Sequence, residues 1–258
     1  MSVYDCFIFN HEVELLEIRL NILDKFVDKF ILTEGDTTFS GKPKESIYLQ
    51  NKDRFSKWEN KIIHNYITIP EVESPWDREI YSRNSIRDLN IFEDNDLILT
   101  SDIDEIPNPE VLEHKDEWVN DDTHFTFQQN CYVYYLNNFY SSDWFGTRAC
   151  TYKYLKNTTV DDIREATEDS NKITGYLITN GGWHFTYCGG EEMIKKKIDS
   201  FCDLQYNTPE VKDNILNNIT DNKDIFFRYW MKYKTVDLDD SFPDYIVKNK
   251  EKYSHLIK

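Results

Sequence analysis

The sequence has no long apolar run. Nowhere do about 18 apolar residues follow one another, and the start of the chain, Met1–Phe9, has no basic region ahead of an apolar stretch. These absences exclude a membrane-spanning helix and a secretory signal in these residues. We therefore predict a protein without a membrane span that stays in the cytoplasm.

The sequence has few cysteines, and their spacing shows no paired motif. The five cysteines are odd in number, widely spread and without a Cys-x-x-Cys pair, which argues against a disulfide framework or a zinc site. We predict that they are reduced core residues.

Basic residues are also in deficit. The chain has 30 Lys and Arg against 47 Asp and Glu, a formal net charge of −17. Such a protein repels a phosphate backbone, so we expect no nucleic-acid partner. An anionic small ligand would need a bound divalent cation or a local cluster of basic side chains. With 15% aromatic residues the chain is not disordered.

Short apolar runs alternate with helical patterns in the first hundred residues. This alternation is typical of a parallel sheet covered by helices on both faces. The predicted strands are Tyr4–Phe9, Lys29–Thr33, Lys61–Ile69 and Asp96–Thr100, and the predicted helices start at Val13 and span Trp76–Leu89.

After residue 120 the sequence becomes rich in aromatic and β-branched residues, which predicts a smaller antiparallel portion. Asn137-Asn138 and Gly146 are the expected turns. The strands predicted here are His124–Tyr135, Arg148–Leu155 and Tyr176–Tyr187, and the helices are Glu191–Phe201, Pro209–Asn217 and Asp224–Tyr233. We predict one α/β domain over residues 1–258.

Three acids follow the strand that ends at Thr100. Asp102, Asp104 and Glu105 repel one another at the carboxyl end of a buried strand unless a cation neutralises them, and ligand sites of open α/β sheets form at this edge. Carboxylate oxygens suit Mg²⁺ or Mn²⁺, whose open positions substrate phosphates fill. A solvated acidic turn that caps the next helix is the alternative. An EF-hand is excluded because its required glycine is absent.

A phosphohydrolase of the haloacid-dehalogenase type also places Asp-x-Asp after an apolar strand. In such enzymes the motif lies near the chain start, whereas about a hundred residues precede it in this sequence. This alternative, a metal-dependent phosphohydrolase of sugar phosphates or nucleotides, is therefore the weaker one. A third is a carbohydrate-binding relic without turnover, against which the intact acidic cluster argues.

Several sequence blocks, in order, resemble glycosyltransferase family 17, which includes the animal enzyme that adds the bisecting N-acetylglucosamine to N-glycans. They are Tyr4–Glu12, Phe39–Lys44, Arg78–Asn84, Ser101–Pro107 and Gly182–Tyr187. The resemblance implies a GT-A type fold, an inverting mechanism, UDP-N-acetylglucosamine as donor and a glycan hydroxyl as acceptor. It also implies a nucleotide-binding half at 1–120 and an acceptor-side half at 121–258.

The resemblance assigns the donor site to named residues. Asp104 is expected to bind Mn²⁺ or Mg²⁺ directly, and Asp102 to contact the ribose or the metal, with Glu105 in support. His184 lies in a strand and by itself is typical of a core histidine. The resemblance adds a metal or diphosphate role for it.

The nucleotide is expected beside residues that follow the first two strands, namely Asn10, Glu12 and Glu34. Glu12 is alternatively an acid in the first turn of a helix. Arg83, on the inward side of its helix, is expected to compensate the diphosphate charge, and Arg78 is a weaker candidate.

On the acceptor side, a glycine pair followed by two acids is similar to the acceptor loop of inverting galactosyltransferases. By that likeness Glu192 is the candidate base and Glu191 the second, although acids favour helix N-termini in any case. Trp144, Trp183 and Tyr187 are candidates for stacking on sugar rings.

Overall fold

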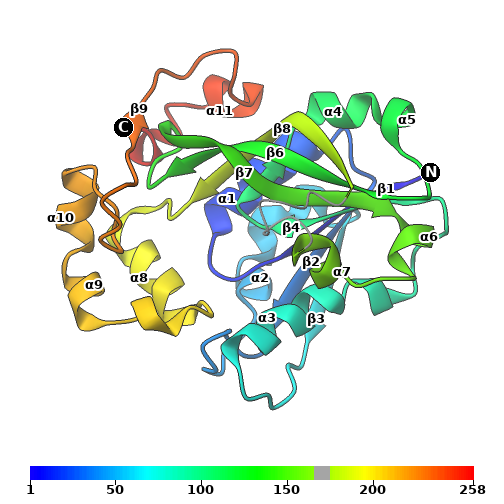
Figure 1. Cartoon of the computed structure of the whole chain (residues 1–258), viewed down its shortest axis with the longest axis horizontal. Helices are drawn as coiled ribbons and strands as arrows, with labels where there is room; N and C mark the ends of the chain where they lie inside the picture. The colour runs from blue at the N-terminus through cyan, green and yellow to red at the C-terminus, as the bar shows by residue number, and fades with distance from the viewer. Residues whose placement is uncertain (166–174) are drawn as a thin grey trace.

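The computed structural model describes residues 1–165 and 175–258, in which nine strands form one sheet (Figure 1). The sheet order is β3-β2-β1-β4-β7-β6-β8-β5, and β9 pairs with β7. The strands are β1 (Val3–Ile8), β2 (Lys29–Gly35), β3 (Ile62–Ile67), β4 (Leu97–Asp102), β5 (Glu105–Pro107), β6 (His124–Val133), β7 (Asn138–Thr151), β8 (Tyr176–Thr186) and β9 (Lys234–Thr235).

Helices connect and cover these strands. None of the helices in the described ranges is both long and apolar enough to cross a lipid bilayer. The α-helices are α1 (Val13–Leu23), α2 (Ile47–Gln50), α3 (Pro75–Asn84), α4 (Pro109–Glu113), α5 (Lys115–Trp118), α6 (Tyr152–Leu155), α7 (Val160–Glu165), α8 (Gly190–Ser200), α9 (Pro209–Asp213), α10 (Ile215–Thr220) and α11 (Asp244–Lys248). The 3₁₀ helices are η1 (Lys52–Trp58), η2 (Arg87–Leu89), η3 (Leu204–Tyr206) and η4 (Ser254–Leu256).

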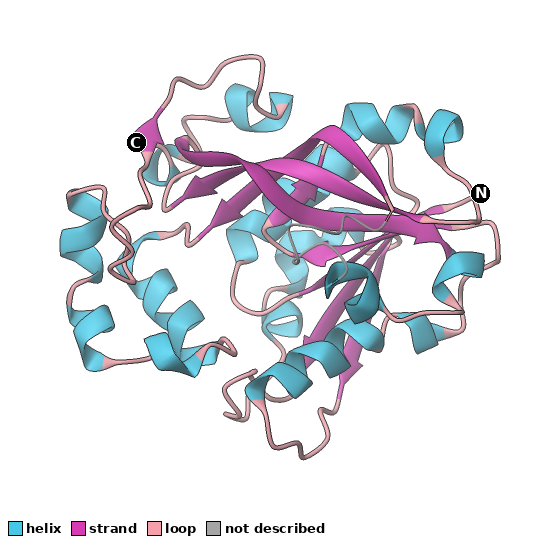
Figure 2. Ribbon diagram, viewed as in Figure 1, coloured by secondary structure: helices cyan, strands magenta, loops and turns pink. Residues whose placement is uncertain are grey.

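The sheet is parallel in its first half and mixed in its second (Figure 2). Strands β3, β2, β1 and β4 run parallel, whereas β7 pairs antiparallel with both β4 and β6, and β6 pairs parallel with β8. The predicted α/β class, with flanking helices and an antiparallel portion after residue 120, is confirmed.

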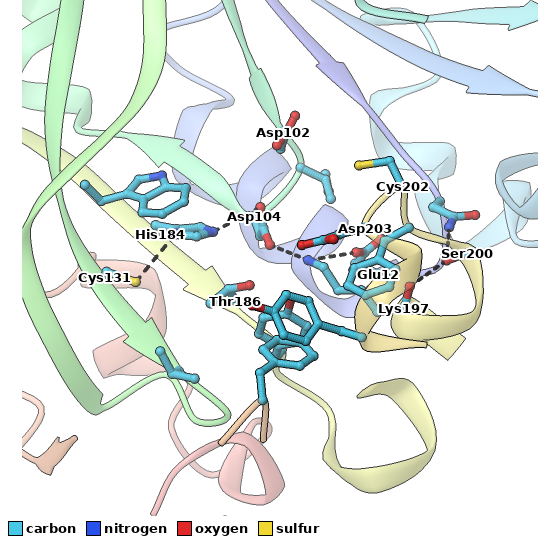
Figure 3. Close-up of a pocket in the computed structure, with 18 of the residues that line it drawn as sticks. Glu12, Asp102, Asp104, Cys131, His184, Thr186, Lys197, Ser200, Cys202 and Asp203 are labelled. Carbon is cyan, nitrogen blue, oxygen red and sulfur yellow. Dashed lines mark hydrogen bonds and ion pairs between the residues drawn. The ribbon is translucent and has the colours of Figure 1, made fainter. Parts of the chain in front are cut away.

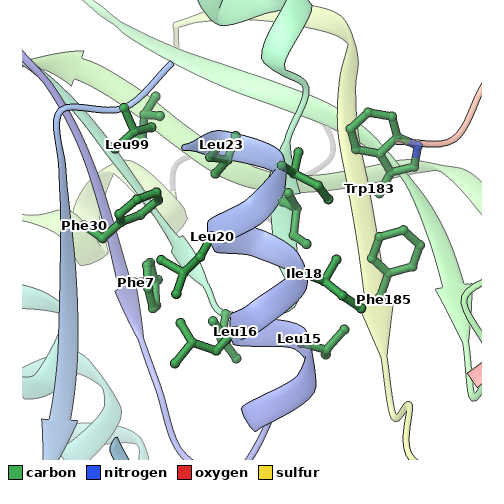
Figure 4. Packing of buried hydrophobic residues seen from close by; sticks show 14 of the residues in the cluster. Phe7, Leu15, Leu16, Ile18, Leu20, Leu23, Phe30, Leu99, Trp183 and Phe185 are labelled. Carbon is green, nitrogen blue, oxygen red and sulfur yellow. The ribbon is translucent and has the colours of Figure 1, made fainter. Parts of the chain in front are cut away.

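Strand β1 is buried on both faces, and its alternate side chains enter two different cores. Phe7 belongs to the larger core, in which Leu16 and Leu20 of α1 also pack with Phe30 of β2 (Figure 4). Cys6 points to the opposite face, into a core that contains residues of α6 and α7. Each fully buried leucine contributes about 1.5–3 kcal/mol, so this sandwich fixes the position of the strand ends that carry the site.

Helix α3 begins with a complete set of capping signals. The Ser74 hydroxyl accepts a hydrogen bond from the Trp76 amide at 3.2 Å, the Asp77 carboxylate accepts one from the Ser74 amide, and Pro75 is the first helical residue. The predicted helix continued to Leu89, but α3 ends at Asn84. This helix carries Arg83 to the buried side, as its spacing predicted.

Three predictions after residue 120 are wrong. The predicted strand Arg148–Leu155 ends at Thr151 with β7, because the Thr151 hydroxyl caps the helix α6 that follows at Tyr152–Leu155. Gly146 lies inside β7, which starts at Asn138, because it occupies a bulge where a Cβ would lie 1.9 Å from the side-chain oxygen of Gln129. The predicted helix Asp224–Tyr233 is an irregular loop in which Phe227 has a φ of +60°. A left-handed Phe cannot continue an α-helix.

Candidate active site

A cavity of about 410 Å³ opens where β1 and β4, which are adjacent and parallel, reach their carboxyl ends (Figure 3). Six of the residues predicted for the donor site line it: Asn10, Glu12, Arg83, Asp102, Asp104 and His184. They come from the ends of β1 and β4, from α3 and from β8, so the fold assembles a site from segments far apart in the chain.

Asp104 is buried and holds two cations. Its Oδ2 lies 2.6 Å from Nζ of Lys197, and its Oδ1 lies 3.5 Å from Nε2 of His184 (Figure 3). Burial alone would raise the pKa of Asp104, but Lys197 and His184 outweigh it and hold the pKa well below its usual range. The residue is therefore a carboxylate at neutral pH, and protein cations occupy it in the absence of a ligand.

Asp102 faces two arginines. Nη2 of Arg83 donates to both carboxylate oxygens at 3.2 and 3.3 Å, and Nη2 of Arg164 donates at 3.1 Å. Arg164 also binds the buried Glu105 through two nitrogens, at 2.7 and 2.9 Å. Burial raises the pKa of Glu105, but Arg164 overrides it and lowers the pKa to about 2. Glu105 thus anchors Arg164 from outside the cavity.

Arg19 of α1 fixes the backbone of the acidic turn, which comprises Asp102–Glu105. This fully buried side chain donates through Nη1 to the carbonyls of Asp102 at 2.9 Å, Ile103 at 3.2 Å and Glu105 at 2.9 Å. Its other nitrogens bind Asp5 at 2.6 and 2.7 Å. A clamp from α1 therefore presets the direction of the Asp102 and Asp104 side chains.

His184 is positioned by β8 and by the ring of Trp144. The two rings stack with centroids 4.2 Å apart, and Nδ1 of His184 lies 3.5 Å from Sγ of Cys131. Trp144 is itself fixed, since its Nε1 donates to Glu105 at 3.0 Å. Burial opposes the charged imidazole, but the Asp104 carboxylate raises the pKa of His184 to about 10.

Residues that follow β1 line another part of the cavity wall. Nδ2 of Asn10 donates to Oγ of Ser200 at 2.7 Å, and Glu12 lies 3.4 Å from Nζ of Lys197. Two buried polar atoms of cavity residues, Oδ1 of Asn10 and Nε of Arg83, have no hydrogen-bond partner among the described residues. Unsatisfied buried groups of this kind are costly, and a polar ligand in the cavity would satisfy them.

The part of the cavity wall that is formed by residues late in the sequence is rich in aromatic side chains. Tyr187, Phe226 and Tyr233 belong to one apolar cluster with α8 and α10, and Lys197 lies over the Tyr187 ring at 5.3 Å. The aromatic side chains that line the cavity are Phe9, Phe39, Trp76, Tyr134, Tyr140, Trp144, Tyr187, Phe201, Tyr206, Phe226 and Tyr233. A charged wall thus faces an aromatic one, the combination that suits a ligand with a phosphate end and a sugar end.

Glu34 lies outside the cavity. Its buried carboxylate accepts hydrogen bonds from Nζ of Lys44, Oγ of Ser46 and the amide of Ile47, each at 2.6 Å, and lies 3.2 Å from Nε2 of His64. Every oxygen is used within the protein. In the structure Glu34 therefore anchors the loop after β2 and does not line the cavity.

The structure does not bring Glu191 and Glu192 to the cavity. The Glu192 side chain is 82% exposed, and Glu191 forms an ion pair at 2.7 Å with Lys195 one helical turn away. Both lie in the first turn of α8, where acids are favoured by the helix dipole. Trp183 is likewise outside the cavity, because its indole donates to the carbonyl of Ser241 from the core.

Among the cavity residues that were not predicted are Arg164, Lys197 and Asp203. Lys197 follows buried Ile194 by three residues on α8, so its helical spacing placed it near the inward side. Asp203 follows the end of α8, and nothing in the local pattern distinguishes it from a surface acid.

Likeness to solved structures is weak. The 4-diphosphocytidyl-2C-methyl-D-erythritol synthase is 11% identical with a TM-score of 0.42, covering 69% of this chain and 88% of that one. The galactosyltransferase LgtC, solved with donor and acceptor sugar analogues, is 9% identical with a TM-score of 0.39, covering 67% and 66%. The glycosyltransferase GlyE of Streptococcus pneumoniae TIGR4 is 13% identical with a TM-score of 0.36, covering 66% and 39%.

No curated protein matches the sequence. The family comparison is different, because the model of one family, glycosyltransferase family 17, aligns with residues 1–258. The chain belongs to glycosyltransferase family 17.

Proposed function

We propose that the protein transfers a sugar, N-acetylglucosamine in keeping with its family, from a UDP-sugar to a glycan hydroxyl, with inversion and with the help of a divalent cation. The observation that carries the proposal is the buried Asp104 with His184 beside it, at the carboxyl end of β4 and inside the cavity. This arrangement suits a leaving diphosphate that needs neutralisation.

The donor atoms fit a cation of the Mn²⁺ or Mg²⁺ class. Asp104 offers a carboxylate, Asp102 offers a second one, and His184, 3.5 Å from Asp104, would offer an imidazole nitrogen after releasing its proton to solvent. Within residues 1–165 and 175–258 no three such side chains already converge on one point. Two protein donors are sufficient when diphosphate oxygens complete the shell. A bound cation would supply charge neutralisation of the leaving group.

Lys197 is the residue that competes with such a cation. Its ammonium lies 2.6 Å from Asp104 and 3.4 Å from Glu12. A divalent cation on Asp104 would displace it, and the released ammonium would then face the diphosphate together with Arg83 and Arg164. These cations explain how a strongly acidic protein accepts an anionic donor.

Asp203 is our candidate for the base that deprotonates the acceptor hydroxyl. The other cavity carboxylates form ion pairs: Glu12 and Asp104 with Lys197, Glu79 and Asp102 with Arg83, and Asp224 with Arg228. Asp203 lines the same cavity (Figure 3), and its carboxylate has no ion pair or hydrogen bond in the described part of the chain. A carboxylate without a partner keeps its lone pairs available for the proton.

Calorimetric titration tests the donor site. UDP, UDP-glucose and UDP-N-acetylglucosamine would be titrated into the wild type, Asp104→Asn and Lys197→Met, each with Mn²⁺ and with a chelator. We expect Mn²⁺ to strengthen UDP binding in the wild type, Asp104→Asn to lose that increment, and Lys197→Met to keep it while binding UDP more weakly in chelator. A wild type that binds no nucleotide in any condition overturns the proposal.

A further inference from the structure

The loop Phe227–Lys232, which we call the rim loop, carries the two most exposed aromatic side chains in the described structure. Tyr229 is 82% exposed and Trp230 is 71% exposed. Their rings stand nearly perpendicular, at 83°, with centroids 6.3 Å apart. Neighbouring exposed aromatics of this size are characteristic of interaction sites.

The rim loop is held in place by a buried carboxylate. Asp224 accepts hydrogen bonds from the amides of Phe226 and Arg228, each at 3.0 Å, from the Arg228 guanidinium at 2.8 and 3.0 Å, and from the Tyr233 hydroxyl at 2.9 Å. Phe227 is kept at a φ of +60°, which is unfavourable for a bulky residue. The hydrogen bonds of Asp224 therefore fix the start of the rim loop and help to maintain the strained backbone of Phe227.

The rim loop is continuous with the cavity. Phe226 and Tyr233 on either side of it line the cavity, and so do Arg228 and Met231 within it. Tyr229 and Trp230 lie between Arg228 and Met231 in the sequence, so each of the two exposed rings is directly joined through the backbone to a residue that lines the cavity.

We propose that Tyr229 and Trp230 bind a second sugar of the acceptor, next to the sugar that reacts inside the cavity. This inference rests on the proposed transferase function. An aromatic face covers the apolar C–H face of a pyranose, and the indole N–H and phenol O–H reach its hydroxyls. The site inside the cavity then holds the reacting sugar, and the rim loop holds the next one.

A lipid surface is the other ligand that exposed Trp and Tyr side chains suit. The net charge of −17 disfavours an anionic membrane, and the continuity of the rings with the cavity favours a glycan. Vesicles are therefore included among the probes.

The test uses a printed glycan array probed with the labelled wild type, Trp230→Ala, Tyr229→Ala and Tyr176→Ala. Tyr176 is the matched control, since it is 64% exposed but starts β8, far along the strand from His184. We expect the wild type to select glycans of two or more sugars, and each rim-loop variant to bind them about tenfold more weakly. Tyr176→Ala should match the wild type. Thermal unfolding and UDP titration should be unchanged in all four proteins.

Three results overturn the inference: equal glycan binding by wild type and rim-loop variants, no array glycan retained by a wild type that binds UDP, or Trp230-dependent binding to phosphatidylcholine or phosphatidylserine vesicles instead. If the wild type binds glycans through the rim loop but binds no UDP, the proposed function fails while the glycan site stands.

Discussion

At the scale of single residues, the cavity is a set of matched charges with one carboxylate left over. Lys197, Arg83 and Arg164 neutralise Asp104 and Asp102, whereas Asp203 has no such partner in the residues described. A carboxylate that lines a cavity without a protein partner is free to contact a ligand, which makes Asp203 a candidate functional residue.

Separate substitution of the two candidate bases, Asp203 and Glu192, gives the sharpest prediction for single residues. Asp203→Asn removes the proton acceptor from the cavity, so we expect kcat to fall by about 10²- to 10⁴-fold with UDP affinity unchanged. Glu192→Gln changes an 82% exposed side chain in the first turn of α8 and should leave kcat within about twofold. Steady-state kinetics with a UDP-sugar and an array-selected acceptor measure both. Full activity of Asp203→Asn would contradict the assignment.

Glu34 gives a prediction about pH and stability. Burial raises its pKa, but hydrogen bonding by His64 and the charge of Lys44 prevail and lower the pKa from 4.5 to about 2. A lowered pKa in the folded state stabilises the protein above pH 4.5, and this contribution is lost as pH falls toward 2. The shift corresponds to on the order of 3 kcal/mol.

Urea unfolding of wild type and Glu34→Gln at several pH values checks this. We expect the variant to be less stable at pH 7 and the difference to shrink steadily below pH 4.5. Glu71→Gln, at an exposed position, should follow the wild type throughout. A difference that does not depend on pH would show that Glu34 contributes by packing and not by charge.

Residue reasoning from the sequence found Asp102, Asp104 and Arg83 but missed the two cations Lys197 and Arg164. Asp102 and Asp104 follow a buried strand directly, so their location at the sheet edge is a local property of the chain. Lys197 and Arg164 reach Asp104 and Asp102 from 93 and 62 positions away. Tertiary packing alone decides such pairs, and a single sequence does not contain that information.

At the scale of elements, the short strand β5 decides whether His184 meets the acidic turn. It pairs with β8 through Glu105 with His184, Ile106 with Trp183 and Pro107 with Gly182. Gly182 has a φ of +136°, and a Cβ there would lie 2.2 Å from the carbonyl oxygen of Ile106. Only glycine permits this close approach of the two strands.

Replacing each of two glycines with alanine distinguishes the effect of this close contact from the effect of backbone strain alone. Gly182→Ala should destabilise the protein by about 3 kcal/mol or more, because strain and a backbone clash add, and it should weaken metal-dependent UDP binding by moving His184. Gly190→Ala also has a positive φ, +78°, but an added Cβ meets nothing within 4 Å, so about 1 kcal/mol is expected. Chemical denaturation of both variants compares them, and equal losses would refute the contact argument.

Elements were predictable where local pattern and tertiary packing agree. The parallel strands β1, β2 and β4 are continuous apolar runs, and their predicted positions hold. The Asp224–Tyr233 segment has helix-like spacing, but its aromatic side chains are divided between the cavity wall and the surface. Phe227 has a φ of +60°, which an α-helix cannot accommodate, so no helix forms after Asp224.

At the scale of the whole molecule, acidic side chains greatly outnumber basic ones. The formal net charge is −17, and in the cavity the cations Arg83, Arg164, Lys197 and Arg228 offset most of the six carboxylates that line it. Most of the excess acids therefore lie outside the cavity and repel one another in the folded state more than in the expanded unfolded chain. This repulsion weakens as salt shortens the Debye length from about 30 Å at 0.01 M to about 8 Å at 0.15 M.

Stability at pH 7 should consequently rise with NaCl over this range. Relief of ~1 kcal/mol of repulsion would raise the melting temperature by about 2–4 °C for a chain of this size. The same titration at pH 4.7, the isoelectric point expected from the composition, serves as the control, because the net repulsion is absent there and salt should have little effect. A melting temperature that falls with NaCl at pH 7 would mean that screened ion pairs, such as those of Glu17 with Arg54 and Lys252, outweigh the repulsion of the whole surface.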